Sequence, residues 1–330
     1  MLAASGGVFG VEKRASNLPR ASLMTQLLPT EGSCFLDLST CLKLRFSGPD
    51  ALRFLNGQIS NDLRKARPNL AIQGSVLTAK GKLNAIVFVS GEAESFFLDA
   101  APEVQHELPV RIERYIVADD VQMEDITETY AIFHLISDSA PSVAGASRIV
   151  QANRFDSIGW DIWADQSTTD SIKKQLLLNN FFCDEESAEV FRIERGIPRW
   201  GRELTDQIIP IEAGLEGAAV DYSKGCYVGQ EVISRIKMSG QTNKRLCGFV
   251  SVTGQPLRAG MRLVVNEDEI REAGWITSAT RSARTGKEIA LGYVKRGFQA
   301  VGSHLLALPA AEVSSQQGIQ VEIVAIPFIK

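Results

Sequence analysis

The sequence has little of what a preformed metal site requires. Its 330 residues include five cysteines and three histidines. No two cysteines form a CxxC pair and the histidines stand far apart, so a structural zinc or cluster site is not expected. An odd number of scattered thiols is also a poor disulfide framework, which favours a reducing compartment. The cysteines are Cys34, Cys41, Cys183, Cys226 and Cys247.

Long apolar runs and an excess of basic charge are absent as well. The longest apolar runs, such as "AIVFV" at 85–89, fall far short of the roughly 20 residues of a membrane-spanning helix. We therefore expect no membrane crossing. The formal net charge of −4 and a pI near 5.6 argue against a protein built to wrap nucleic acid. The alternative of direct tRNA binding would depend on a local basic patch formed by Lys237, Lys244 and Arg245.

The composition that remains is that of a soluble globular protein. It contains 45% hydrophobic and 22% charged residues, and 330 residues predict two or three domains. Residues 1–23 are rich in Ala, Ser and Gly without a sustained period, which predicts a disordered tail or a true start at Met24. A transit peptide is the alternative, and Glu12 counts against it. The favoured compartment is a bacterial cytoplasm, with the mitochondrial matrix second.

Hydrophobic periodicity predicts α+β structure over residues 24–243. Alternation at 42–46 indicates a half-buried strand with Lys43 and Arg45 on its polar side, and Ser47 then suits the cap of a helix that Gly57 follows. A long connection at 197–215, rich in Pro, Gly and polar residues, has the character of a functional loop. The further predicted elements are strands at 83–89, 95–100 and 130–136 and helices at 168–180 and 186–196.

After about residue 244 the pattern changes to six short strands separated by turn residues. Evenly spaced short strands without helices predict a small antiparallel barrel or sandwich. We therefore expect residues 244–330 to form a separate C-terminal domain. The six runs are "LCGFVSV", "MRLVV", "GWITSAT", "IALGYV", "HLLAL" and "QVEIVAI".

One motif, "KGCYVGQE" at 224–231, carries the most chemical information. Apolar residues after it have helical spacing, which places Cys226 at or just before a helix N-terminus and beside Lys224. Both neighbours would stabilise a thiolate, and Gly225 and Gly229 would let a ligand approach closely. The alternative is that Cys226 is a small packing residue and the glycines serve a turn. No histidine partner for the thiol can be named.

The same eight residues resemble the signature of the folate-binding iron–sulfur cluster assembly and tRNA-modifying proteins related to the glycine-cleavage T-protein, an aminomethyltransferase. The resemblance covers about residues 34–330. It implies an α+β fold of three modules around a folate cavity, the second module ferredoxin-like, with a C-terminal antiparallel β-barrel. Other stretches that resemble the family are "FLNGQISNDL" (54–63), "TAKGKL" (78–83), "RIERGIPRWG" (192–201), "PIEAGL" (210–215) and "RIKMSGQTNKRL" (235–246).

The resemblance also implies a cofactor, tetrahydrofolate or a derivative, and residues that bind it. Glu194 in "RIERG" matches the family's acidic residue on the pterin ring, where a carboxylate can accept two adjacent N–H groups. The alternative for Glu194 is a helix-end residue paired with Arg192 or Arg195. Cys226 and Lys224 are the implied reactive pair. The other cofactor-binding candidates are Asp99, Tyr227, Arg235, Gly225, Gly229, Gln230 and Glu231.

One departure from the family separates two functional hypotheses. The aminomethyltransferase branch has an acidic stretch where this chain has Asn84, Ala85 and Ile86, so the acid/base group of aminomethyl transfer is missing. The first hypothesis is a folate-binding accessory protein, expected to be a monomer, that supports assembly or repair of iron–sulfur clusters in client enzymes, including tRNA-modifying ones. Its partners would be client iron–sulfur proteins or assembly factors. The alternative is a folate-dependent aminomethyltransferase.

Overall fold

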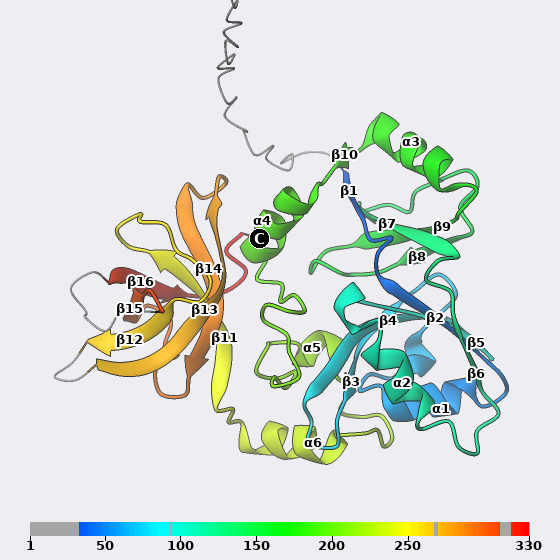
Figure 1. Ribbon diagram of the computed structural model, residues 1–330, viewed down its shortest axis with the longest axis horizontal. Coiled ribbons are helices and arrows are strands. Elements are labelled where there is room, and N and C mark those ends of the chain that lie inside the picture. Colours follow the sequence, from blue (N-terminus) through cyan, green and yellow to red (C-terminus); the bar gives the residue numbers. More distant parts are fainter. Residues whose placement is uncertain (1–32, 93, 267–269, 311–317, 330) are drawn as a thin grey trace, which may run out of the picture.

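A computed structural model describes residues 33–92, 94–266, 270–310 and 318–329. The chain forms three modules around a central space, two sheets with their helices on one side and a barrel on the other (Figure 1). The expected α+β fold with a C-terminal antiparallel barrel is confirmed. The predicted tail, residues 1–23, lies outside the described residues.

The first sheet has five strands in the order β3-β4-β5-β2-β6. The predicted alternation in β2 is confirmed for Leu42, Leu44 and Phe46, which are fully buried. Lys43 departs from the pattern: its side chain is also buried, because its Nζ donates to the carbonyl oxygens of Ser39, Cys41 and Thr127. The strands are β2 (Leu42–Ser47), β3 (Ile72–Leu77), β4 (Leu83–Glu92), β5 (Ser95–Ala100) and β6 (Gln122–Asp125).

Helix α1 (Ala51–Gln58) starts later than the sequence predicts. Ser47 is the last residue of β2, and the chain turns at Gly48, whose φ of 126° is available to glycine alone. The prediction that Ser47 caps the helix is therefore wrong, and so is the prediction that Gly57 follows it, since the helix extends to Gln58. The other helical segments of this module are η1 (Leu63–Lys65), η2 (Pro102–Val104) and α2 (Glu107–Glu113).

The second sheet has the order β10-β1-β7-β9-β8. Strand β1 (Cys34–Asp37) pairs in parallel with β10 (Phe181–Phe182) and antiparallel with β7 (Tyr130–Ile136). The module is completed by β8 (Arg148–Gln151), β9 (Gly159–Asp165) and α3 (Thr169–Asn179). The helix predicted at 168–180 is confirmed. Helix α4 (Glu185–Glu194) then leads from this sheet to the barrel (Figure 1).

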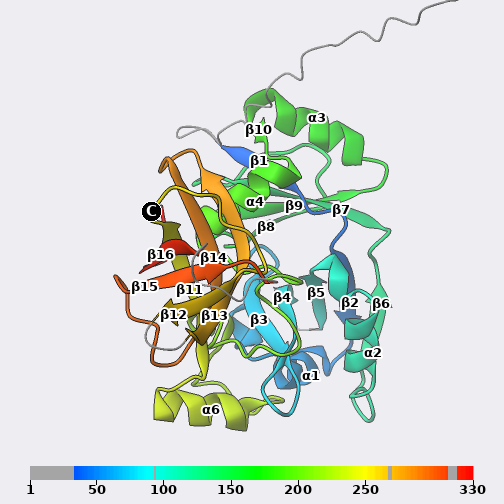
Figure 2. The ribbon, with the colours of Figure 1, turned by 60° about the vertical axis from the view of Figure 1, so that its left-hand side comes forward.

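The C-terminal barrel contains all six strands that the sequence predicts, closed in the order β11-β14-β13-β12-β15-β16 (Figure 2). Its interior is filled by apolar side chains such as Phe249, Leu263 and Ile323. The strands are β11 (Lys244–Ser251), β12 (Arg262–Asn266), β13 (Ile270–Ser282), β14 (Lys287–Lys295), β15 (His304–Leu308) and β16 (Ile319–Val324).

Two connections bring the modules together. The 197–215 loop, α5 (Glu216–Ala219) and α6 (Gln230–Ser239) run from α4 beneath the first sheet to β11 (Figure 1). After β16 the chain returns to α4, where the backbone N–H of Phe328 donates to the carbonyl of Glu194 at 2.8 Å. Among the described residues, no helix is long and apolar enough to span a membrane.

Candidate functional site

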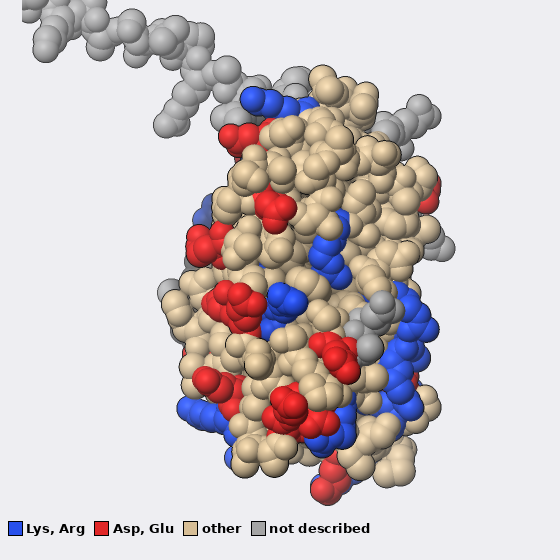
Figure 3. All heavy atoms as spheres, turned by 90° about the vertical axis from the view of Figure 1, so that its right-hand side faces the viewer, with Lys and Arg blue, Asp and Glu red and all other residues tan. Residues whose placement is uncertain are grey.

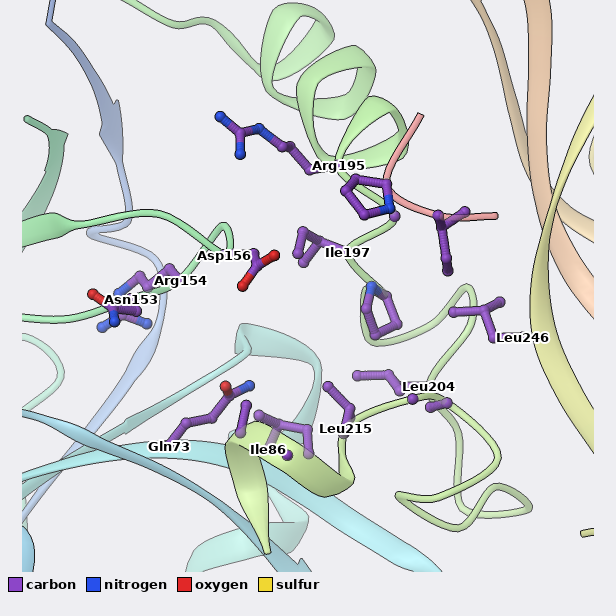
Figure 4. Close-up of a pocket in the computed structure, with 18 of the residues that line it drawn as sticks. Gln73, Ile86, Asn153, Arg154, Asp156, Arg195, Ile197, Leu204, Leu215 and Leu246 are labelled. Atoms are coloured by element: carbon purple, nitrogen blue, oxygen red, sulfur yellow. The ribbon is translucent and has the colours of Figure 1, made fainter. Parts of the chain in front are cut away.

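The three modules enclose a cavity of about 890 Å³, within the range of about 300–1,000 Å³ usual for small-molecule sites. Strands β3 and β4 supply Gln73 and Ile86 to its wall (Figure 4). The loop between β8 and β9 supplies Asp156, the 197–215 loop Leu204, and strand β11 Leu246. Apolar walls are thus interrupted by a few polar side chains, which suits a ligand with apolar faces and polar edges.

A second cavity of about 750 Å³ lies against the first. It extends toward β1, the end of β5 and helix α4, and its wall includes Asp99. The two cavities therefore lie on either side of a common partition in the centre of the molecule. The shared wall residues are Gln73, Ile86, Phe88, Arg154, Ile197, Pro198 and Leu204.

A buried charge network stands at this partition. The guanidinium of Arg154 donates to both carboxylate oxygens of Asp99 at 2.8 Å and to Asp161 at 2.6 Å. Asp161 also contacts Nδ1 of His134 at 2.8 Å, and all four side chains are nearly inaccessible to solvent. Because one guanidinium serves two carboxylates, the network does not favour full ionisation of both.

The pKa values of the two carboxyl groups reflect this arrangement. Burial raises the pKa of Asp99 to about 6, against the opposing charge of Arg154. Burial acts in the same direction on Asp161, but Arg154 and His134 together lower its pKa to about 2. Asp99 is therefore the carboxyl group of the pair that binds a proton more readily, and it faces the second cavity.

Three charged side chains that line the first cavity have no ion-pair partner among the described residues. They are Asp156, Arg195 and Arg245. Asp156 comes from the second sheet, Arg195 follows α4, and Arg245 lies on β11. A ligand with N–H donors at one end and carboxylates at another would complement these charges.

The strand segment that separates the functional hypotheses forms part of the cavity wall. Ile86 and Phe88 line both cavities, whereas Asn84 accepts a hydrogen bond from Arg111. Ala85 is buried in the core of the first module. The wall at this strand is therefore apolar. The nearby carboxylate of Asp99 comes from the neighbouring strand β5, opposite Phe88, and that of Asp156 comes from a different module.

The "KGCYVGQE" segment is fixed to the first module by Lys224. Its Nζ donates to the backbone carbonyls of Asn56, Ile59 and Asn61 at 2.6–2.7 Å, around the end of α1. Burial lowers the pKa of Lys224 to about 8. The ammonium is thus committed to the backbone, and this differs from the expected role as a charge that activates the neighbouring thiol.

Cys226 is the exposed cysteine of the five. Burial raises the pKa of Cys34 and Cys247 to about 11 and of Cys41 and Cys183 to about 12. Helix α6 begins four residues after Cys226, at Gln230, so the thiol does not sit at the helix N-terminus as expected. Its accessibility, rather than a neighbouring positive charge, distinguishes this thiol from the other four.

The other residues of the motif also have structural surroundings. A Cβ at Gly229, whose φ is 88°, would lie 2.7 Å from the carbonyl oxygen of Thr78, whereas one at Gly225 would meet nothing within 4 Å. Tyr227 is buried beneath the ammonium of Lys224, 5.3 Å from the ring centroid. In the first turn of α6, Glu231 pairs with Arg235 at the exposed surface, and Gln230 follows the cap.

Few of the predicted cofactor-binding residues line either large cavity. Asp99 lines the second. Glu194 lines neither: its buried carboxylate accepts a hydrogen bond from Ser282 Oγ at 2.6 Å and lies 3.8 Å from Arg284 Nε. Its alternative partner, Arg192, pairs with Glu189 and Glu203 instead. The remaining predicted residues lie outside both cavities: Tyr227, Arg235, Gly225, Gly229, Gln230 and Glu231.

Sequence reasoning missed the polar residues that do face the cavities, above all Gln73, Arg154 and Asp156. They lie on a strand and a hairpin loop far from the recognised motifs. The one usable signal was "RFDSIG" at 154–159, a turn-like stretch between two strands. Nothing in that stretch indicates that the turn faces inward, because the enclosing wall comes from other modules.

Comparison with known proteins agrees with this architecture. Residues 244–330 match the family described as the glycine cleavage T-protein C-terminal barrel domain. The structure of aminomethyltransferase T of the glycine cleavage system from Bartonella henselae superposes with a TM-score of 0.78 at 17% identity, covering 90% of this chain and 86% of that one.

The relatives with similar sequences have different names. An aminomethyltransferase of Shouchella clausii is 24% identical, over 89% of this chain and 86% of its own. The mitochondrial iron–sulfur cluster assembly factor IBA57 homolog of Dictyostelium discoideum is also 24% identical, over 64% and 61%. An uncharacterized protein of Haemophilus influenzae is 27% identical, over 75% and 84%.

The chain therefore has an aminomethyltransferase-like fold, and its C-terminal barrel matches the barrel domain of the glycine cleavage T-protein. The chain is similar over most of its length to aminomethyltransferases and, over a shorter stretch, to an iron–sulfur cluster assembly factor.

Proposed function

We propose that this protein is a folate-binding accessory factor that supports assembly or repair of iron–sulfur clusters in client proteins, tRNA-modifying enzymes among them. The observation that carries the proposal is the exposed Cys226 on a loop that Lys224 fixes to the first module. An accessible thiol on a rigid support suits transient contact with a cluster, its iron or a client. The similarity to the IBA57 homolog supports the same role.

We further propose that tetrahydrofolate or a derivative binds in the central cavity. A reduced folate has a pterin with adjacent N–H donors, an apolar middle and a glutamate with two carboxylates. The unpaired carboxylate of Asp156 and the guanidinium groups of Arg195 and Arg245 complement its two ends, and Ile86 and Leu246 supply apolar wall between them. Residues 24–243 would form most of the folate-binding region, with the barrel of 244–330 closing one side.

A direct role in nucleic-acid binding has less support. The formal net charge is −4, and Figure 3 shows acidic and basic side chains interspersed over the centre of one face. The residues named as a local patch include Lys244, which lies 3.7 Å from the carboxylate of Glu212. We therefore place folate and client proteins ahead of RNA as partners.

Complementation tests the proposed role. The gene is deleted from its host, and iron–sulfur enzyme activities are measured with a wild-type copy, with Cys226→Ser and with Met238→Ser. The last variant is a matched control, since it removes an exposed sulfur from helix α6, where Met238 is 83% exposed. We expect wild type and Met238→Ser to restore the activities and Cys226→Ser to fail. Full restoration by Cys226→Ser would exclude a role for the thiol.

The second candidate function is aminomethyl transfer, which the aminomethyltransferase relatives favour. At the strand positions where that branch carries its acid, this chain has Asn84, Ala85 and Ile86, none of which offers a carboxylate. We expect no folate-dependent release of ammonia from an aminomethyl-lipoyl carrier protein. Turnover comparable to that of an aminomethyltransferase measured alongside would make transfer the preferred function.

A further inference from the structure

The carboxylate of Asp156 points into the central cavity, toward the space above β3 and β4 (Figure 4). No described residue donates a hydrogen bond to it or pairs with it. The guanidinium of the neighbouring Arg154 does not pair with Asp156, because it pairs with Asp99 and Asp161. The carboxylate of Asp156, a residue that is also exposed to solvent, is therefore available to a ligand in the cavity.

The backbone holds Asp156 in this place. It is the one non-glycine residue with positive φ, 52°, in the part of the chain that the structure describes. Its loop is tied at both ends, since the N–H of Gln151 donates to the carbonyl of Asn69 and that of Ala152 to the carbonyl of Gly159, both at 2.8 Å. A left-handed conformation costs free energy for a residue with a Cβ, although Asp tolerates it better than most.

Gln73 faces the same space from the opposite wall (Figure 4). Its side-chain amide forms no hydrogen bond with another described residue, and it offers one donor group and one acceptor. Ile86 and Leu215 supply apolar surface beside it. A ligand that satisfies all of these groups is a flat heterocycle with adjacent N–H donors on one edge and a carbonyl beside them.

We propose that Asp156, assisted by Gln73, recognises the 2-amino-4-oxopyrimidine edge of a reduced pterin, the role that family resemblance gives to Glu194. The inference rests on the proposed folate function and deepens it. Glu194 is unsuited to this role because its carboxylate is occupied by Ser282 and lies near Arg284, outside both cavities. Asp156 accepts two N–H groups of the ring, while Gln73 contacts a neighbouring polar atom.

Calorimetric titration of the full chain with 5-formyltetrahydrofolate tests the assignment. Asp156→Asn keeps the size of the side chain and suits the left-handed backbone, so the fold should be retained. We expect it to weaken binding by about 10- to 100-fold, as loss of a charge-assisted pair predicts. Asp138→Asn, a control at an exposed position outside the cavities, should bind like wild type. Glu194→Gln should change the affinity less than threefold.

A ligand analogue separates recognition from a general loss of charge. Wild type should bind the 2-desamino-2-methyl analogue more weakly than the parent, and Asp156→Asn should largely abolish that preference. If wild type does not bind the parent folate, the proposed folate function fails. A second outcome is that wild type and Asp156→Asn bind the parent folate equally well, whereas Glu194→Gln binds it more weakly. In that case the assignment to Asp156 is wrong, while the folate function stands.

Discussion

Replacing Lys224 with methionine should loosen the loop that carries Cys226. Methionine keeps the apolar stem but removes three hydrogen bonds to the carbonyls of Asn56, Ile59 and Asn61. Hydrogen bonds that involve a charged group contribute about 1.5–3 kcal/mol each. The cost of burying an ammonium, which also lowers the pKa of Lys224 to about 8, offsets part of that sum. We expect a net loss of about 2–4 kcal/mol.

Hydrogen exchange measures this loss locally. The amides of Asp221 and Val228 donate to the carbonyls of Ser60 and Gly57, so both report opening of the loop. A loss of about 2–4 kcal/mol should speed their exchange by about 30- to 700-fold. Lys80→Met is the control, because Lys80 is exposed and forms no side-chain hydrogen bond or ion pair with another described residue. Equal exchange in wild type and Lys224→Met, or equal acceleration by both variants, would refute the reasoning.

Three further predictions concern the thiol, the motif and the buried network. Iodoacetamide should label Cys226 before the other four cysteines in the native protein, because those four are buried or half-buried. In urea all five should react at similar rates, and peptide mass spectrometry ranks the five sites. Gly229→Ala should lower the free energy of unfolding by about 1–3 kcal/mol, because residue 229 has a positive φ and its Cβ would meet the carbonyl oxygen of Thr78. Gly225→Ala should lower it much less. Similar urea midpoints for the two variants would contradict this prediction. The pKa of Asp99 is raised in the folded state from 3.8 to about 6, so its contribution to stability is complete below pH 3.8 and is lost as the pH rises through 6. This change in pKa corresponds to at most about 3 kcal/mol. Asp99→Asn should flatten the fall in stability between pH 4 and 7, and an unchanged slope would count against the assignment.

The barrel is the part of the fold that could be predicted best. Each of its strands is a short apolar run bounded by turn residues, and that information is local. Closure is not local: β11 pairs with β14 and β16, and β12 pairs with β15. Likewise, no sequence pattern joins Cys34 to Phe181 in the parallel pair of β1 and β10. Element types therefore followed from periodicity, while their partners depend on packing between distant segments.

The candidate site was harder to predict because the direction of a side chain depends on distant backbone. The sequence places Lys43 on the polar side of a strand and Lys224 beside a thiol, yet each ammonium is buried among three backbone carbonyls. Glu194 matches a family pattern, yet its carboxylate meets the barrel. Asp156 belongs to no motif, and only the assembled modules make its turn part of a cavity wall.

The "KGCYVGQE" segment forms a rigid support that holds Cys226 at the surface. Lys224 ties it to the end of α1, Tyr227 buries its ring beneath that lysine, and Gly229 lets it pass close to the carbonyl of Thr78. Cys226 takes no part in these contacts and remains exposed. Cys226→Ser should therefore leave the free energy of unfolding within about 0.5 kcal/mol of wild type while it abolishes complementation in the deletion host. If Cys226→Ser both unfolds more easily and fails to complement, the failure is explained by lost packing of the side chain, and a chemical role of the thiol is not supported.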